Sequence, residues 1–112
     1  MKGRATYPGY PTIAAGWAGT RSSPLRGVVA VSYEKISISP AHITVKAGST
    51  VKWMNFDATL HNVAITSGPV KFSSPALNKG GIYAATFAKP GLYRYLCTFH
   101  PGTMIGTIMV VR

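Results

Sequence analysis

Short β-type segments separated by turn residues are the feature that most limits what this chain can fold into. From Val28 onward, short runs rich in Val, Ile, Thr and aromatic residues alternate with Gly, Pro, Asn or Ser. The run "TVKWMNF" places Val51, Trp53 and Asn55 on one face of a strand, and no stretch carries the apolar stripe of a helix. About seven or eight strands at this spacing predict an all-β fold over residues 28–112, either an antiparallel sandwich or a small barrel.

Residues 1–27 have a different composition from the rest of the chain. They contain Pro8, Pro11 and Pro24 together with several glycines, and no hydrophobic period runs through them. We therefore expect an irregular N-terminal arm or linker over residues 1–27 and one domain over residues 28–112. At 112 residues the chain is long enough to bury a core, and its single cysteine excludes an internal disulfide.

The softest donor atoms of the chain gather in "YLCTFHPGTM", which holds Cys97, His100 and Met104 within eight residues. Cys97 shares the face of the preceding tyrosines in the predicted strand "LYRYLC", so its side chain is expected to point inward. A lone cysteine is more often an inert core residue than a ligand, and His42 is expected to be an ordinary strand histidine. Three donors this close in sequence can nevertheless surround one ion, and His61 in "FDATLHNVAI" is the candidate for a fourth.

A thiolate, two imidazoles and a thioether form a soft ligand set. Two histidines and a cysteine in a trigonal arrangement, with a weak axial methionine, are typical of copper sites that transfer electrons. Zinc more often takes further cysteines or a carboxylate, and a catalytic site keeps a position open for water. The ligand types therefore favour copper and electron transfer over an enzyme.

Two stretches also resemble a known family. The segments "VKAGSTVKWMNFDATLHNV" and "FAKPGLYRYLCTFHPGTM" are similar, in this order, to the motifs of small blue copper proteins of the cupredoxin superfamily, plastocyanin- and amicyanin-like. The resemblance covers residues 28–112 and implies a Greek-key β-sandwich. It also implies one type 1 copper ion with four ligands: His61, Cys97, His100 and Met104.

The resemblance carries two further implications for the ligand loops. Asn62 is expected to tie the two loops together by hydrogen bonds near the cysteine sulfur, a contact that orients ligands and tunes potential. Electrons are expected to leave through the exposed edge of one histidine, in a patch of apolar or small residues: Phe99, His100, Pro101 and Gly102. The spacing here is C-x2-H-x3-M, between the C-x2-H-x4-M of plastocyanins and the C-x2-H-x2-M of amicyanins, although the proline after the histidine is closer to amicyanins.

The charge balance is extreme, with 12 Lys and Arg against only Glu34 and Asp57, a formal charge of +10. Such an excess predicts an anionic partner, and for an electron carrier we expect a cytochrome or oxidase subunit with an acidic docking face. Nucleic acid is disfavoured because the basic residues are spaced singly and no binding motif is present. The scarcity of carboxylates also admits a second interpretation, which is adaptation to an acidic medium.

The function expected from these observations is transport of one electron between redox partners through Cu(I) and Cu(II), without enzymatic activity. Two alternatives remain: an extracytoplasmic copper carrier, although Met- and His-rich tracts are missing, and a cupredoxin domain of a larger oxidase. No apolar run approaches the roughly 18–20 residues of a membrane span. We expect a periplasmic or otherwise extracytoplasmic protein, with membrane anchoring through a leader that is missing before Met1.

Overall fold

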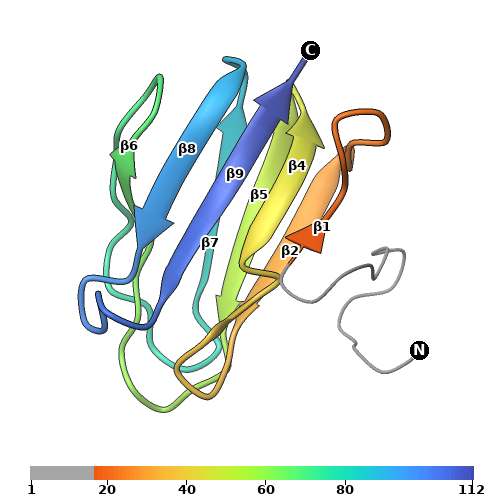
Figure 1. Ribbon diagram of the computed structural model, residues 1–112. Helices are drawn as coiled ribbons and strands as arrows, with labels where there is room; N and C mark the ends of the chain where they lie inside the picture. Colours follow the sequence, from red (N-terminus) through yellow and green to blue (C-terminus); the bar gives the residue numbers. More distant parts are fainter. Residues whose placement is uncertain (1–16) are drawn as a thin grey trace.

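A computed structural model describes residues 17–112 (Figure 1). Within these residues the chain forms β-strands and no helix. The strands are β1 (Trp17–Ala18), β2 (Val28–Tyr33), β3 (Ile38–Ser39), β4 (His42–Lys46), β5 (Ser49–Asn55), β6 (Ala64–Ser67), β7 (Ile82–Phe87), β8 (Gly91–Leu96) and β9 (Ile105–Val111). Eight of these nine strands lie within residues 28–112, so the predicted all-β fold is confirmed. Within the described part, no helix is long and apolar enough to cross a membrane.

The strands form two sheets packed face to face (Figure 1). One sheet has five strands in the order β1-β4-β9-β8-β6, and the other has four in the order β3-β2-β5-β7. The predicted β-sandwich is therefore confirmed, but the sheets are mixed rather than wholly antiparallel. Three of the strand pairs are parallel: β1 with β4, β2 with β5, and β4 with β9.

The parallel pairs have a physical cause in the path of the chain. Strand β3 runs antiparallel to β2 in one sheet, and the chain then passes through Pro40 into β4 of the other sheet. The tight turn at residues 47–48 then returns the chain as β5, which lies parallel to β2. Alternation of buried and exposed residues does not encode this crossover, because it fixes only the face that each side chain occupies.

The N-terminal arm predicted over residues 1–27 falls partly outside the described residues. Within the part that is described, β1 pairs with β4. Further on, Leu25 is buried and forms a bridge to Val45. Both contacts place parts of residues 17–25 along β4 at the edge of the five-stranded sheet, while the boundary of the domain at residue 28 remains a prediction.

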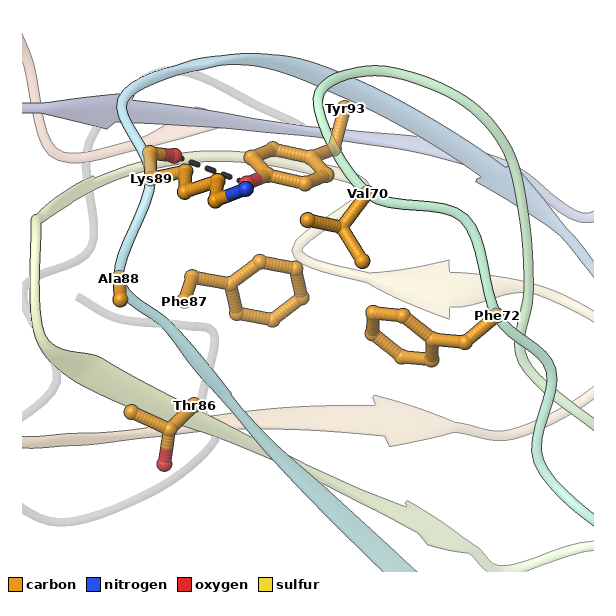
Figure 2. A pocket seen from close by; sticks show the side chains of 7 residues that line it. All are labelled: Val70, Phe72, Thr86, Phe87, Ala88, Lys89 and Tyr93. Atoms are coloured by element: carbon orange, nitrogen blue, oxygen red, sulfur yellow. Dashed lines mark hydrogen bonds between the residues drawn. The ribbon is translucent and has the colours of Figure 1, made fainter.

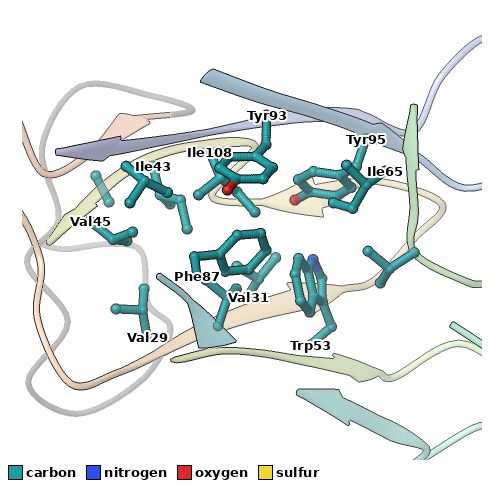
Figure 3. Packing of buried hydrophobic residues seen from close by; sticks show 14 of the residues in the cluster. Val29, Val31, Ile43, Val45, Trp53, Ile65, Phe87, Tyr93, Tyr95 and Ile108 are labelled. Atoms are coloured by element: carbon teal, nitrogen blue, oxygen red, sulfur yellow. The ribbon is translucent and has the colours of Figure 1, made fainter. Parts of the chain in front are cut away.

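Aromatic side chains fill the space between the sheets (Figure 3). Trp53 of β5 is fully buried and meets Tyr95 of β8 edge to face, with ring centroids 5.5 Å apart. Phe87 of β7 meets Tyr93 in the same way at 4.9 Å. Contacts of this kind add roughly 0.5–1.5 kcal/mol per pair to the gain from burial, and they fix the position of β8, the strand that leads directly into Cys97.

Candidate metal centre

The predicted donors Cys97, His100 and Met104 lie in the loop between β8 and β9, at one end of the sandwich. Cys97 continues the inward-facing side of β8 and is fully buried, as its strand position predicted. The loop closes on itself through backbone hydrogen bonds, because the N–H of Cys97 donates to the carbonyl of Met104 at 3.0 Å. The N–H groups of His100 and Met104 donate to the carbonyls of Cys97 and His100 respectively, at 3.1 and 3.0 Å.

His61 reaches the same place from the loop between β5 and β6. It lies three residues before β6, which begins at Ala64. His61 instead forms an isolated bridge with Leu77, in which the Leu77 N–H donates to the His61 carbonyl at 2.7 Å. Its side chain is fully buried although it lies in a loop.

The three donor atoms converge closely enough for one ion. The Sγ of Cys97 lies 3.6 Å from Nδ1 of His61 and 3.9 Å from Nδ1 of His100, and all three atoms fall within 4.8 Å of one another. Two ligand atoms held at roughly 2.0–2.3 Å from one ion, at trigonal or tetrahedral angles, would lie about 3.6–3.8 Å apart. The residues present therefore fit a metal ion bound by two imidazoles and a thiolate.

Met104 lies next to this group of donors. Its side chain is fully buried and belongs to the same core cluster as Cys97. The backbone hydrogen bonds of the loop hold it to both Cys97 and His100. The structure thus brings the fourth predicted donor to the same end of the sandwich.

Asn62, the residue after the first histidine, joins the two ligand loops. Its Oδ1 accepts a hydrogen bond from the N–H of Thr98 at 2.8 Å, and its Nδ2 donates to the Thr98 hydroxyl at 3.0 Å. Thr98 directly follows Cys97, so this pair of bonds fixes the distance between the loops beside the sulfur. The bonds are solvent-accessible, however, and do not contact the sulfur themselves.

Sequence reasoning missed Asp57, which holds the far side of the His61 ring. One oxygen of its carboxylate lies 2.7 Å from Nε2 of His61. Because a carboxylate can only accept, the proton of the neutral imidazole lies on Nε2, which leaves the lone pair of Nδ1 directed toward Cys97. A sequence signal was available, since Asp57 is one of only two carboxylates and stands four residues before His61.

Asp57 also anchors the turn between β2 and β3. Its two oxygens accept hydrogen bonds from the backbone N–H groups of Lys35 and Ile36, at 2.7 and 2.9 Å. Burial acts to raise the pKa of the Asp57 carboxyl, but the hydrogen bonds from His61, Ile36 and Lys35 outweigh it and lower that pKa. The group therefore remains a carboxylate and joins a remote turn to a ligand histidine.

Tyr33 covers another side of His61. The two rings meet edge to face, with centroids 5.6 Å apart, and the tyrosine is fully buried. Its hydroxyl has no hydrogen-bond partner in the described part of the chain. Burial, followed by the charges of Tyr95 and Cys97, raises the pKa of this phenol, so it stays neutral beside the donors.

The second predicted histidine ligand differs from the first in its access to solvent. His100 is half-buried, whereas His61 is fully buried, and their rings meet at an angle of 64° with centroids 5.1 Å apart. Its sequence neighbour Phe99 is 46% exposed, and Pro101 and Gly102 are exposed as well. Exposed apolar and small residues therefore lie next to His100 in the sequence, and their role in docking stays a prediction.

Comparison with known proteins identifies the family. Residues 26–111 match the copper binding proteins of the plastocyanin/azurin family. The chain belongs to this family. Copper is thus the ion of this site, and the prediction of copper made from the donor types is confirmed.

Individual relatives are similar over most of the chain. Amicyanin-alpha of Methylorubrum extorquens is 33% identical over 109 residues, covering 95% of this chain and 91% of that protein. Amicyanin of Paracoccus versutus is 40% identical over 85 residues, which span 73% of this chain and 64% of the relative. A solved amicyanin mutant in its reduced state superposes with a TM-score of 0.70 at 30% identity, covering 89% of this chain and 97% of that one.

Proposed function

We propose that this protein carries single electrons between redox partners, with copper bound by His61, Cys97 and His100 and more weakly by Met104. The observation that carries the proposal is the convergence of three soft donor atoms within 4.8 Å at a buried place. Bound copper would supply the one-electron couple between Cu(I) and Cu(II). The family of the chain supports the same function.

Rigid ligands suit electron transfer, because donors that stay in place leave little to reorganise when the oxidation state changes. His61 is held by Asp57 at 2.7 Å and by the bridge to Leu77. The other donors are held by the hydrogen bonds within their loop. None of these contacts involves the ion, so the chain itself supplies the bonds that hold the donors in place.

The same site offers little to an enzyme. Catalytic proton transfer needs an acid or base within hydrogen-bond reach of the reacting group. Asp57 is engaged with His61 and two backbone N–H groups, while Glu34 is exposed in the β2–β3 turn. With four protein donors around the ion, we propose an electron carrier rather than a catalyst.

Electrons are proposed to enter and leave at His100. Its partial exposure beside Phe99 supports this route, since an apolar surface lets a partner approach closely. Two exposed cations lie at the end of the sandwich that carries the donors. Lys35 belongs to the turn that Asp57 anchors. Lys79 precedes Gly80, whose N–H donates to the carbonyl of Asn55, the last residue of β5, at 2.6 Å. They favour a cytochrome or oxidase subunit with an acidic docking face.

We further propose that the protein works outside the cytoplasm, in the periplasm or an equivalent space, with a leader or lipid anchor preceding Met1. The relationship to amicyanins supports this location. Detection of the native protein in a periplasmic fraction would test it, and recovery with cytoplasmic markers would contradict it.

The visible spectrum after addition of Cu(II) tests the ligands. An intense thiolate-to-copper band is expected, and Cys97→Ser should abolish it because a hydroxyl is not deprotonated at neutral pH. Thr98→Ser is a matched control, since it changes the neighbouring residue and keeps the hydroxyl that Asn62 binds. A colourless wild-type protein, or a variant at Cys97 that keeps the band, would refute the site.

Stopped-flow oxidation by candidate partners tests the function. The second-order rate is expected to fall steeply with salt, because electrostatic steering raises association by roughly 10- to 1,000-fold. A rate independent of salt would refute the acidic docking face. Rapid loss of copper to a chelator, together with slow electron exchange, would favour the copper-carrier alternative instead.

A further inference from the structure

Four cations gather at the end of the sandwich opposite the ligand loops. Three backbone N–H groups of the β4–β5 turn bind three other segments: Lys46 to the carbonyl of Leu25, Ala47 to that of Val111 and Gly48 to that of Phe87, at 2.8, 2.6 and 2.8 Å. Arg26 follows Leu25, Arg112 follows Val111, and Lys89 stands two residues after Phe87, so each bond brings one further cation near Lys46 and the turn. We call this group the cationic end; its residues are Arg26, Lys46, Lys89 and Arg112.

The cationic end has no carboxylate side chain. The chain contains only two, Glu34 and Asp57, and both belong to the end that carries the ligands. Asp57 contacts His61, and the backbone of Glu34 exchanges hydrogen bonds with Ser37 in the turn that Asp57 anchors. Among the described residues 17–112, the positive charge of the side chains is therefore least compensated at the end farthest from the donors.

Exposed apolar side chains lie beside these cations. Val28 is 68% exposed. It follows Gly27, whose carbonyl accepts a hydrogen bond from the N–H of Thr50 near the same turn. Near Lys89, a cavity of about 150 Å³ opens among apolar side chains, with Val70, itself 40% exposed, at its rim (Figure 2). Cations next to exposed aliphatic surface suit the interface of a charged bilayer.

We propose that the cationic end binds the surface of a membrane rich in anionic phospholipids, which turns the ligand loops toward the aqueous space. The bound groups would be lipid phosphates, which interact with Lys and Arg. Each cation near such a surface raises partitioning roughly fivefold. Four cations on one end therefore favour reversible, oriented attachment.

Distance favours a lipid surface over a redox partner at this end. Strand β8 lies between Lys89 and Cys97, and its six residues span about 20 Å at roughly 3.3 Å per residue. A partner bound at the cationic end would leave the proposed route through His100 on the far side of the molecule. This argument from distance rests on the proposed function, whereas the charge distribution at the cationic end is independent of it.

Sedimentation of the full chain with vesicles tests the proposal. Binding is expected to phosphatidylcholine vesicles containing about a third phosphatidylglycerol, to be weak with phosphatidylcholine alone, and to disappear near 1 M salt, where the Debye length is about 3 Å. Lys46→Gln with Lys89→Gln should lower the partition coefficient roughly 30-fold. The matched control, Lys35→Gln with Lys79→Gln, removes the same charge from the other end and should leave binding within a factor of two or three. Circular dichroism confirms that each variant is folded.

Three outcomes would overturn the proposal. Absence of binding to anionic vesicles would do so directly, and equal losses in both double variants would show that binding follows total charge rather than this surface. If the Lys46 and Lys89 variant instead slowed reaction with a redox partner, and no vesicle binding occurred, the surface would belong to an acidic protein. A failure of the copper site would change none of these vesicle measurements, so the two proposals are tested separately.

Discussion

Replacing Asp57 by alanine should destabilise the protein by about 2–4 kcal/mol in the absence of metal. The His61 ring is fully buried, and stranding its Nε2–H without an acceptor costs about 1–3 kcal/mol. The N–H groups of Lys35 and Ile36 also lose their acceptor, but they belong to exposed residues and water replaces it, so each adds only about 0.5 kcal/mol. Urea unfolding of the metal-free protein measures the total.

The same replacement should raise the reduction potential of the copper-loaded protein. Asp57 places a negative charge against the ring of His61, and this charge stabilises the more positive Cu(II). One unit charge at about 6–7 Å, in an effective dielectric of about 20, is worth roughly 2.5 kcal/mol, or about 100 mV for one electron. Because the Asp57 side chain is 15% exposed, we expect the rise to be about 50–100 mV.

Two variants separate charge from hydrogen bonding. Asp57→Asn keeps one acceptor oxygen without the charge, so its potential should rise nearly as far as in alanine while its stability loss is smaller. Glu34→Gln removes the only other carboxylate side chain, which is exposed, and should shift the potential much less. A reduction potential unchanged in Asp57→Asn would refute the electrostatic reasoning. A loss of less than about 0.5 kcal/mol in the free energy of unfolding of Asp57→Ala would refute the role of Asp57 in anchoring His61.

Three further substitutions test the surroundings of the site. Met104→Leu should keep the thiolate band and raise the potential because the axial bond is weak; complete loss of copper would contradict the axial assignment. Asn62→Ala should cost about 1 kcal/mol in urea unfolding, since its bonds to Thr98 are exposed, and an unchanged stability would remove its role in joining the loops. A methyl group on Gly106 would lie 2.5 Å from the Tyr95 ring, so Gly106→Ala should cost about 1–3 kcal/mol and lower the thermal midpoint; an unchanged midpoint would show that Tyr95 moves freely.

Local patterns predicted the faces of strands well. Val51, Trp53 and Asn55 are all buried, as the alternation in their strand required. Cys97 is buried for the same reason, because it continues the inward face of β8. Side-chain direction along a strand depends on neighbouring positions alone, so a single sequence is sufficient for this part of the fold.

Features that depend on contacts between distant segments could not be predicted in the same way. The direction of pairing between β2 and β5 follows from the crossover after β3, which leaves no periodic signal. The role of Asp57 depends on a turn more than twenty residues earlier. The cationic end could not be predicted from the sequence either, because its four residues are widely separated there. Only the backbone hydrogen bonds of the β4–β5 turn bring them together.

The contacts around the donors explain why a loop-built site can be rigid. Loops are normally the more mobile parts of a fold, yet here each ligand loop is tied to structure outside itself. Asp57 couples the His61 ring to the β2–β3 turn, and Asn62 couples the same loop to Thr98, the residue after Cys97. A ligand could move only if these bonds broke together, which makes the arrangement of donors a property of the folded chain. Copper would then be held by donors that these bonds keep in place, as low reorganisation during electron transfer requires.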